Sequence, residues 1–360
     1  MRILIAPDKY AGTLTSQEAA TAIAAGWART APLDELDLAP LSDGGPGFVD
    51  TLHAALGGTL EAVTVRGPLG AAAPATLLLV GHTAYVESAQ ACGLALTGGA
   101  DARRASTYGV GELLLAAIDA GAREIIVGLG GSGTTDGGAG LLAALGATAD
   151  RPLDEGPAGL VGVTHIDLTA ARAAVGGVSI VAASDVDNPL TGLFGAAKVF
   201  GPQKGLTEDE LPGVDGALQD LAAATDRKTA AGKGAGAAGG LGFALALLGA
   251  DRRPGFEVVA EATGLAARAA AADLVLTGEG AFDFTTRGGK VPAGVAALAG
   301  EHARPCVVLA GRVDVGNREM RALGVESAYA MVERAGDRAL TEPGAALEEL
   351  AAHVADQWSP

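Results

Sequence analysis

The sequence contains few cysteines, few aromatic residues and little positive charge. Its two cysteines, Cys92 and Cys306, lie far apart and its five histidines show no paired spacing, so neither a disulfide framework nor a zinc site is indicated. Aromatic residues make up 4% and hydrophobic residues 49%, which predicts a core of Ala, Leu and Val. The net charge of −17 argues against a nucleic-acid or anionic-membrane surface. Because no apolar run approaches the ~18 residues of a membrane span and no signal peptide opens the chain, we expect a soluble, cytoplasmic protein.

Lysine is also scarce, which makes each lysine informative. Most of the positive charge is arginine, and the lysines are Lys9, Lys198, Lys204, Lys228, Lys233 and Lys290. All except Lys228 lie in glycine-containing segments that we expect to be loops. A compact ammonium group in such a loop can meet a phosphate as a point charge. These lysines are therefore candidate anion ligands, and the alternative for each is a solvated loop charge.

The chain is organised around residues 124–140, which read EIIVGLGGSGTTDGGAG. The run from Ile125 to Val127 is typical of a buried parallel strand, and the segment from Leu141 onward predicts a helix. Seven glycines fall between Gly128 and Gly140. A strand, a glycine-rich turn and a helix start form an anion site, because backbone N–H groups and the helix dipole favour negative charge there. The alternative is a tight turn without a ligand.

The same stretch also matches the dinucleotide-binding pattern G-x-G-x-x-G between Gly128 and Gly133. That pattern requires an acidic residue at the end of a second strand about 20 residues further on. Asp150 lies near that distance, but it follows a helix-like run and precedes a proline. A nicotinamide-dependent oxidoreductase is therefore the second interpretation, and a phosphate loop is the first.

Acidic residues follow several predicted strands, each beside glycine or another polar residue. They are Asp8, Asp43, Asp136, Asp185 and Glu279. Asp185 and Asp187 together present the oxygen ligands that Mg²⁺ prefers, and the alternative for them is an Asx-turn before Pro189. Acids, glycine loops and loop lysines fit phosphoryl transfer, where catalysis is positioning and charge stabilisation. The chain contains no G-x-x-x-x-G-K-[ST] motif and no protein-kinase catalytic loop.

At 360 residues the chain is long enough for two domains, and the alternation of predicted strands and helices indicates an α/β protein. The strands predicted over 60–65, 75–80 and 83–87 are separated by short turns and have antiparallel character. We therefore place a domain boundary near Gly67. Parallel strand–helix units return by Leu274.

Taken together, the motifs resemble the glycerate kinases of type I over nearly the whole length. The resemblance rests on blocks that occur in the family's order: Ala6-Pro7-Asp8, residues 43–47 (DGGPG), Glu87-Ser88-Ala89, Thr107-Tyr108-Gly109, residues 128–138, Asp185 with Asn188-Pro189-Leu190, residues 199–205 (VFGPQKG), 234–240 and 277–290. The resemblance implies ATP-dependent phosphorylation of glycerate with Mg²⁺, usually at the 2-hydroxyl.

The resemblance also implies two α/β domains with the active site in the cleft between them. One domain is flavodoxin-like and would combine residues 1–67 with 281–360. The other, residues 68–280, would be an inserted mixed-sheet α/β domain that is likened to a restriction-enzyme core and carries the glycine-rich phosphate loop.

Roles for individual residues follow as hypotheses. Asp185 is the proposed base that orients the glycerate hydroxyl, and Lys204 and Lys290 would neutralise phosphate or substrate charge. The full assignment is Asp185, Lys290, Asp43 and Glu279 as catalytic; Gly130, Gly131, Ser132, Gly133, Thr134 and Lys204 as ATP-binding; Asp8, Lys9, Ser88 and Asp283 as substrate-binding; and Asp136 and Asp187 as metal ligands. Any of these carboxylates could instead cap a helix.

The chain departs from the family pattern at two places. The family often has lysine where this chain has Ala11, whereas the lysine here is Lys9. Ala281 and Thr285 stand at positions that are usually arginine and glutamine. These differences leave open a non-catalytic regulator that binds a hydroxy acid on a kinase-like scaffold.

Overall fold

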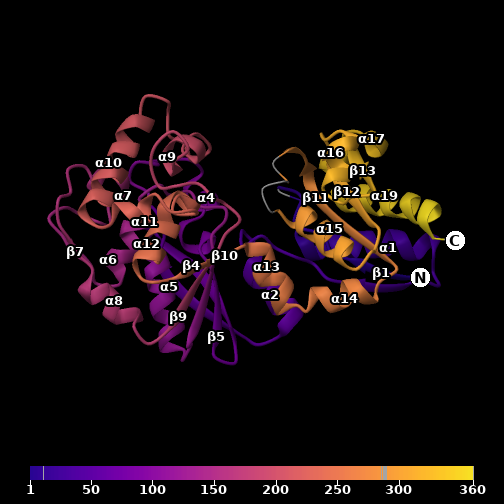
Figure 1. Ribbon diagram of the computed structural model, residues 1–360, viewed down its shortest axis with the longest axis horizontal. Coiled ribbons are helices and arrows are strands. Elements are labelled where there is room, and N and C mark those ends of the chain that lie inside the picture. The colour runs from indigo at the N-terminus through magenta and orange to yellow at the C-terminus, as the bar shows by residue number, and fades with distance from the viewer. Residues whose placement is uncertain (11, 285, 287–289, 360) are drawn as a thin grey trace. The chain divides into compact units, whose positions relative to one another are not determined.

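The computed structural model describes residues 1–10, 12–284, 286 and 290–359, which form two compact units (Figure 1). Unit 1 contains residues 1–43, 50–56 and the chain from Phe256 onward, and unit 2 contains residues 44–49 and 57–255. Both units combine sheets with helices, so the predicted α/β class is confirmed. The substitutions noted at Ala11 and Thr285 lie outside the described residues.

The limits of the two units differ from the predicted boundaries at residues 67 and 281. Strand β3 (Thr59–Arg66) pairs with β4 (Ala72–Val80) in unit 2, so the antiparallel segment begins before Gly67. Strand β11 (Leu274–Phe282) pairs with β1 (Arg2–Ile5) in unit 1. Pairing between strands that are distant in sequence therefore decides where each unit begins.

Unit 1 is built on a parallel sheet with the strand order β13-β12-β11-β1-β2. Its further strands are β2 (Glu35–Leu38), β12 (Cys306–Val313) and β13 (Ser327–Ala330). The chain runs outward in one direction from β1 to β2 and in the other from β11 through β12 to β13. The order of connection therefore reverses between β1 and β11, and the carboxyl ends beside such a point are where open α/β sheets bind ligands.

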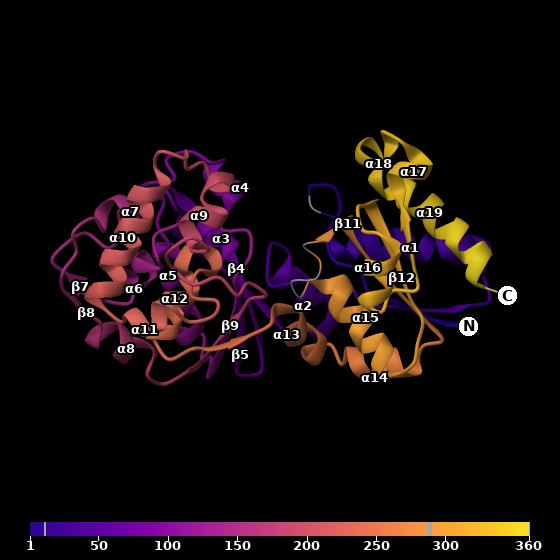
Figure 2. The same cartoon turned by 45° about the horizontal axis from the view of Figure 1, so that its top comes forward.

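Helices cover both faces of this sheet. Buried residues of β1 pack with Ile23 and Trp27 of α1 and with Leu347 of α19, and Figures 1 and 2 show these two helices side by side. Helix α15 contacts β11 and β12, and α14 contacts β1. The helices that contribute to unit 1 are α1 (Ser16–Thr30), α2 (Phe48–Leu56), α13 (Gly255–Ala262), α14 (Leu265–Ala271), α15 (Val291–Glu301), α16 (Asn317–Ala322), α17 (Met331–Ala335), α18 (Arg338–Thr341) and α19 (Pro343–Trp358).

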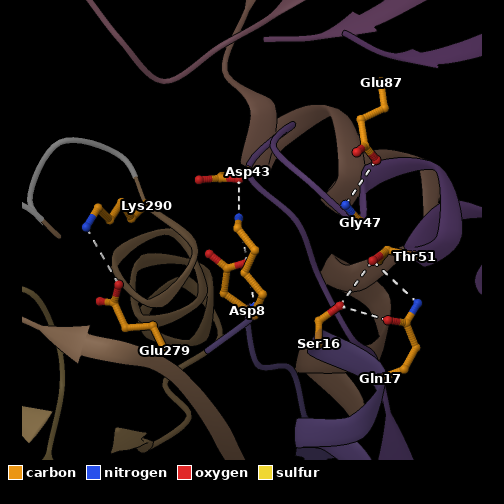
Figure 3. A network of polar contacts seen from close by, with 10 residues as sticks. Asp8, Ser16, Gln17, Asp43, Gly47, Thr51, Glu87, Glu279 and Lys290 are labelled. Atoms are coloured by element: carbon orange, nitrogen blue, oxygen red, sulfur yellow. Dashed lines mark hydrogen bonds and ion pairs between the residues drawn. The ribbon is translucent and has the colours of Figure 1, made fainter. Parts of the chain in front are cut away.

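Helix α1 begins directly after the capping residue Thr15. The Thr15 side chain accepts a hydrogen bond from the Glu18 backbone N–H, and Glu18 accepts in return from the Thr15 N–H, which completes a capping box. The Oγ atoms of Ser16 and Thr51 lie 3.0 Å apart and join α1 to α2 (Figure 3). These contacts fix the helix that directly follows the loop after β1.

Unit 2 contains a mixed sheet with the strand order β10-β9-β6-β5-β4-β3. Strands β3, β4 and β5 (Thr83–Glu87) are antiparallel, as predicted, and β5, β6 (Glu124–Gly128), β9 (Ser179–Ala183) and β10 (Asp251–Arg253) are parallel. A separate pair joins β7 (Thr148–Ala149) to β8 (Ile166–Asp167). The carboxyl ends of β5, β6 and β9 meet at one edge of the sheet.

Short helices and turns surround this sheet, and helices α5 and α12 pack on it (Figure 2). They are α3 (Ala89–Cys92), α4 (Leu94–Thr97), α5 (Tyr108–Asp119), α6 (Ala139–Ala144), α7 (Gly156–Gly159), α8 (Thr169–Val175), α9 (Ala196–Phe200), η1 (Pro202–Lys204), α10 (Leu211–Ala224), α11 (Arg227–Ala230), η2 (Ala237–Gly240) and α12 (Leu241–Leu247). None of the helices in the described part of the chain combines the length and apolar composition needed to cross a membrane.

Candidate active site

The polar side chains that follow the strands of unit 1 line a single cavity of about 560 Å³. Asp8 and Lys9 follow β1, and Asp43 lies in the segment after β2. Glu279 lies within β11, and Lys290 directly precedes α15. The structure thus brings together five predicted site residues to which the sequence assigned catalytic and substrate-binding roles (Figure 3).

Glu279 corrects one prediction about local structure. The sequence placed it in a glycine turn after a short strand, but β11 continues through Phe282 because residues 275–282 pair with β12. Gly278 is needed for a close approach: a Cβ atom there would lie 2.1 Å from the Leu309 carbonyl oxygen and 2.3 Å from the Tyr10 hydroxyl. Asp283, a predicted substrate ligand, directly follows this longer strand.

Lys9 connects two carboxylates of the cavity. Its Nζ atom lies 2.8 Å from Asp43 Oδ1 and 3.6 Å from Asp8 Oδ1. Burial alone would lower the pKa of Lys9, but the Asp8 and Asp43 carboxylates outweigh it and raise that pKa. The lysine therefore stays charged at neutral pH.

Asp8 is a strongly perturbed carboxyl group of the cavity. It is 5% exposed, and burial raises its pKa to about 7, although the Lys9 ammonium opposes the change. Burial also raises the pKa of Glu279, which accepts a hydrogen bond from the Thr286 hydroxyl and lies 3.8 Å from Lys290 Nζ. Asp8, with its pKa of about 7, can therefore accept or give a proton at neutral pH.

The glycine-rich loop of unit 2 follows β6 as predicted, but close packing accounts for its glycines. A Cβ atom on Gly130 would lie 2.5 Å from the Cα atom of Gly45, and one on Gly131, which has φ +69°, would lie 2.6 Å from Pro46. Gly133 packs against α4 in the same way. The adjacent turn is held by Glu87, whose Oε2 atom accepts from the Gly47 N–H at 3.0 Å (Figure 3).

The same loop does not have the geometry of a dinucleotide-binding turn. Gly128 is the last residue of β6, and helix α6 begins only at Ala139, well past Gly133. In the dinucleotide motif the glycines lead directly into the helix, whose N-terminus binds the pyrophosphate. Asp150 lies after β7 and accepts hydrogen bonds from the Thr164 N–H. These positions do not support the oxidoreductase interpretation.

Lys204, predicted to bind ATP, is buried behind the loop. Its side chain is 2% exposed, and Nζ donates to Ser132 Oγ and to the Thr134 carbonyl oxygen, each at 2.8 Å. Burial lowers its pKa to about 8. Lys204 therefore acts through the loop, whose shape it fixes. Ser88, a predicted substrate ligand, is likewise fully buried and donates to the Gly128 carbonyl oxygen at 2.7 Å.

The two predicted metal ligands have other partners. Asp136 is fully buried and accepts from the Thr107 N–H and hydroxyl and from the N–H groups of Gly138 and Gly140, at 2.8–3.2 Å. These donors oppose the rise of its pKa that burial causes. Asp187 lies 2.7 Å from Arg252 Nη2 and 3.4 Å from Lys233 Nζ. Asp136 thus anchors the start of α6, and Asp187 belongs to an ion-pair cluster.

Asp185, the predicted base, follows β9 in unit 2. Its Oδ1 atom accepts from the Gly255 N–H at 2.9 Å, so the carboxylate holds the first residue of α13. Across the described residues, no group of three or more His, Cys, Asp or Glu side chains is arranged to hold a metal ion.

Sequence reasoning missed part of the cavity in unit 1. Its wall also contains Tyr10, Arg312 and the apolar residues Met331, Val332, Ala339 and Leu340. No role was assigned to any of these residues from the sequence. The apolar residues reach the cavity because α17 packs on β12 and α18 packs on α17 and α19.

Comparison with known proteins gives a consistent result. The model of the glycerate kinase family matches residues 3–359. A glycerate kinase from Halalkalibacterium halodurans is 38% identical, over 98% of this chain and 97% of its own. A glycerate 2-kinase from Escherichia coli K12 is 37% identical, over 93% and 92%. A crystal structure of a protein assigned as glycerate kinase 2, from Salmonella typhimurium LT2, has a TM-score of 0.81 at 37% identity and covers 99% of this chain and 98% of its own.

Proposed function

Because the chain belongs to the glycerate kinase family and phosphorylates glycerate, we propose that it transfers the γ-phosphoryl group of ATP to the 2-hydroxyl of D-glycerate. The observation that carries this proposal is the cavity of unit 1, where Asp8, Asp43 and Glu279 converge with two lysines. In the step, the glycerate O2–Pγ bond forms, the bond between Pγ and the β-phosphate oxygen breaks, and ADP leaves. The hydroxyl proton passes to a carboxylate of the enzyme.

We assign the proton acceptor to Asp8 in place of Asp185. Asp8 lines the cavity and has a pKa of about 7, so a large fraction of it is ionised at neutral pH. Asp185 uses one carboxylate oxygen to hold the Gly255 N–H. A base whose pKa lies near the working pH is ionised in a large fraction of the molecules and is still basic enough to accept a proton.

Lys9 and Lys290 are the proposed cations for the substrate anions. Lys9 is fixed between two carboxylates, which orients its ammonium group without a ligand. Lys290 lies near Glu279 and precedes α15, so its backbone and side chain face the same cavity. Charge stabilisation by such fixed cations is the main catalytic contribution in phosphoryl transfer.

The carboxylates of this cavity also fit Mg²⁺. This ion takes oxygen ligands, and it usually binds through one or two carboxylates together with substrate phosphates and waters, so a complete cage of side chains is not required. Asp43 and Glu279 are the proposed ligands, and the ion would neutralise the charge on the phosphate oxygens. We do not assign Asp136 or Asp187 to the metal, because neither residue lines this cavity.

The glycine-rich loop remains our proposed anion site in unit 2. The Thr135 hydroxyl of this loop is fully buried and has no hydrogen-bond partner among the described residues. Lys204 is the proposed positioning residue for this loop. Since the reaction consumes ATP, we propose the cytoplasm as its location.

The test is incubation of the pure protein with ATP, Mg²⁺ and D-glycerate, followed by ³¹P NMR of the product. 2-Phosphoglycerate and ADP are expected. 3-Phosphoglycerate would refute the assigned acceptor hydroxyl, and turnover that is independent of Mg²⁺ would refute the assigned cofactor. A parallel reaction with NAD⁺ in place of ATP tests the oxidoreductase interpretation, for which no change in absorbance at the NADH band is expected.

A further inference from the structure

The cavity of unit 1 has an apolar half that phosphoryl transfer to glycerate does not use. Met331 and Val332 begin α17, and Ala339 and Leu340 lie in α18. Met331 and Ala339 are 1% and 4% exposed, so they belong to the fixed core of the unit. Val332 and Leu340 are 41% and 71% exposed, and thus present apolar surface at the cavity. Together these residues give one side of the cavity an apolar face, and apolar lining of this kind is typical of small-molecule sites.

The cavity has room for a molecule much larger than glycerate. A volume of about 560 Å³ lies within the range of about 300–1,000 Å³ that is typical of sites for much larger molecules. Glycerate is a three-carbon hydroxy acid with a carboxylate, and it has no surface that an aliphatic wall would recognise. The polar half, with Asp8, Lys9 and Lys290, suits that acid or a phosphate, but the wall requires a ligand with a large apolar face.

We propose that the wall formed by Met331, Val332, Ala339 and Leu340 receives the adenine ring of ATP, so that the nucleotide binds in unit 1 and not at the glycine-rich loop of unit 2, to which the sequence assigned it. This inference rests on the proposed use of ATP. The triphosphate then extends from the wall toward Lys9 and Lys290 in the same cavity. The location agrees with the topology, because nucleotides in open α/β sheets bind at the carboxyl ends of the strands where the order of connection reverses.

The experiment replaces the exposed part of the wall with polar groups that carry no charge. In Val332→Gln/Leu340→Gln, the apolar face is lost, and since both side chains are partly exposed, the fold is retained. The matched control is Leu33→Gln, which alters a 97% exposed leucine of the same unit that lies outside the lining of the cavity. KM for ATP and for glycerate, and Ki for inorganic tripolyphosphate, are measured for each protein.

We expect KM for ATP to rise about tenfold in the double variant, as the adenine loses its apolar contact. KM for glycerate and Ki for tripolyphosphate should stay within about twofold, since neither molecule has a base, and Leu33→Gln should match the wild type. An unchanged KM for ATP would overturn the inference, and so would a rise confined to glycerate, which would place the acceptor on the wall. If the wild type does not use ATP at all, the proposed function fails with it, and the wild-type assay alone reveals this.

Discussion

Asp8→Asn provides the most direct test of the proposed chemistry. With a pKa of about 7, Asp8 is ionised in about one tenth of the molecules at pH 6 and in about nine tenths at pH 8. If it accepts the hydroxyl proton, kcat/KM of the wild type should therefore rise about tenfold over this interval. The amide cannot accept the proton, so the variant should lose about 10²–10⁴-fold in kcat and this dependence on pH.

The assay couples ADP formation to NADH oxidation and covers pH 5.5 to 8.5. The protonation state of ATP also changes with pH, but this affects both proteins equally. The ratio of wild-type to variant rates therefore reports the ionisation of the Asp8 carboxyl group alone. Asp50→Asn, an exposed carboxylate on α2 of the same unit, is the control and should follow the wild type. A ratio that is constant from pH 6 to pH 8, or a variant with more than about a third of the wild-type rate, would exclude Asp8 as the base.

Thermal unfolding separates loss of chemistry from loss of structure. The pKa of Asp8 rises from 3.8 to about 7 on folding, so the folded state binds the proton more tightly. The free energy of unfolding of the wild type therefore falls as the pH rises from about 4 to about 7, by at most about 4 kcal/mol. Asp8→Asn removes this fall in the free energy of unfolding. The variant should therefore have a higher Tm than the wild type at pH 8, even though we expect it to lose activity. A lower Tm at pH 8 would show that the carboxylate charge stabilises the fold.

Two further predictions concern the scaffold. The pKa of Lys204 is lowered from 10.5 to about 8 in the folded state. Between pH 8 and pH 10 the unfolded chain therefore binds more protons than the folded protein, and the free energy of unfolding of the wild type should rise with pH over this range. In thermal unfolding, Lys204→Met should lack this gain. Equal slopes of Tm against pH for the variant and the wild type would contradict the lowered pKa of Lys204. Gly26→Ala should destabilise unit 1 by about 1–3 kcal/mol, because its Cβ atom would lie 2.1 Å from the Glu348 carbonyl oxygen. Gly300→Ala, with no atom within 4 Å, should instead be neutral or stabilising by up to about 1 kcal/mol in urea unfolding.

Local pattern was sufficient to predict several of the strands. The β-branched run from Ile125 to Val127 and the alternation before Gly67 carry their own signal, and both form strands. Residues 278–282 (GEGAF) instead predicted a turn, because glycine is typical of turns. Their strand exists because β12 lies beside them, and no local pattern contains that information. The small strand β10 (Asp251–Arg253) escaped for the same reason, as it exists only through its pairing with β9.

The candidate site divides in a similar way. The sequence predicted that Asp8 and Asp43 follow strands. The strand order explains why they meet at one edge of the sheet of unit 1. The sequence could not distinguish a carboxylate that faces a cavity from one that anchors a backbone, because both stand beside glycine and polar residues. Asp136 is of the second kind: its donors come from Thr107 and from the turn that follows it. Burial, which depends on the whole fold, separates the two cases.

Charge balance links the site to the acidic composition of the chain. Among the described residues that line the cavity, the carboxylates of Asp8, Asp43 and Glu279 face the ammonium groups of Lys9 and Lys290, and Arg312 lies 3.2 Å from the Asp314 carboxylate. The lysines are thus largely neutralised by their neighbours, and the polar half is not a basic patch that would attract any anion. A triphosphate needs additional positive charge to bind there. This is the physical reason to include Mg²⁺ in the proposed function: under that proposal, a protein with a net charge of −17 would favour a metal-bound nucleotide over other anions.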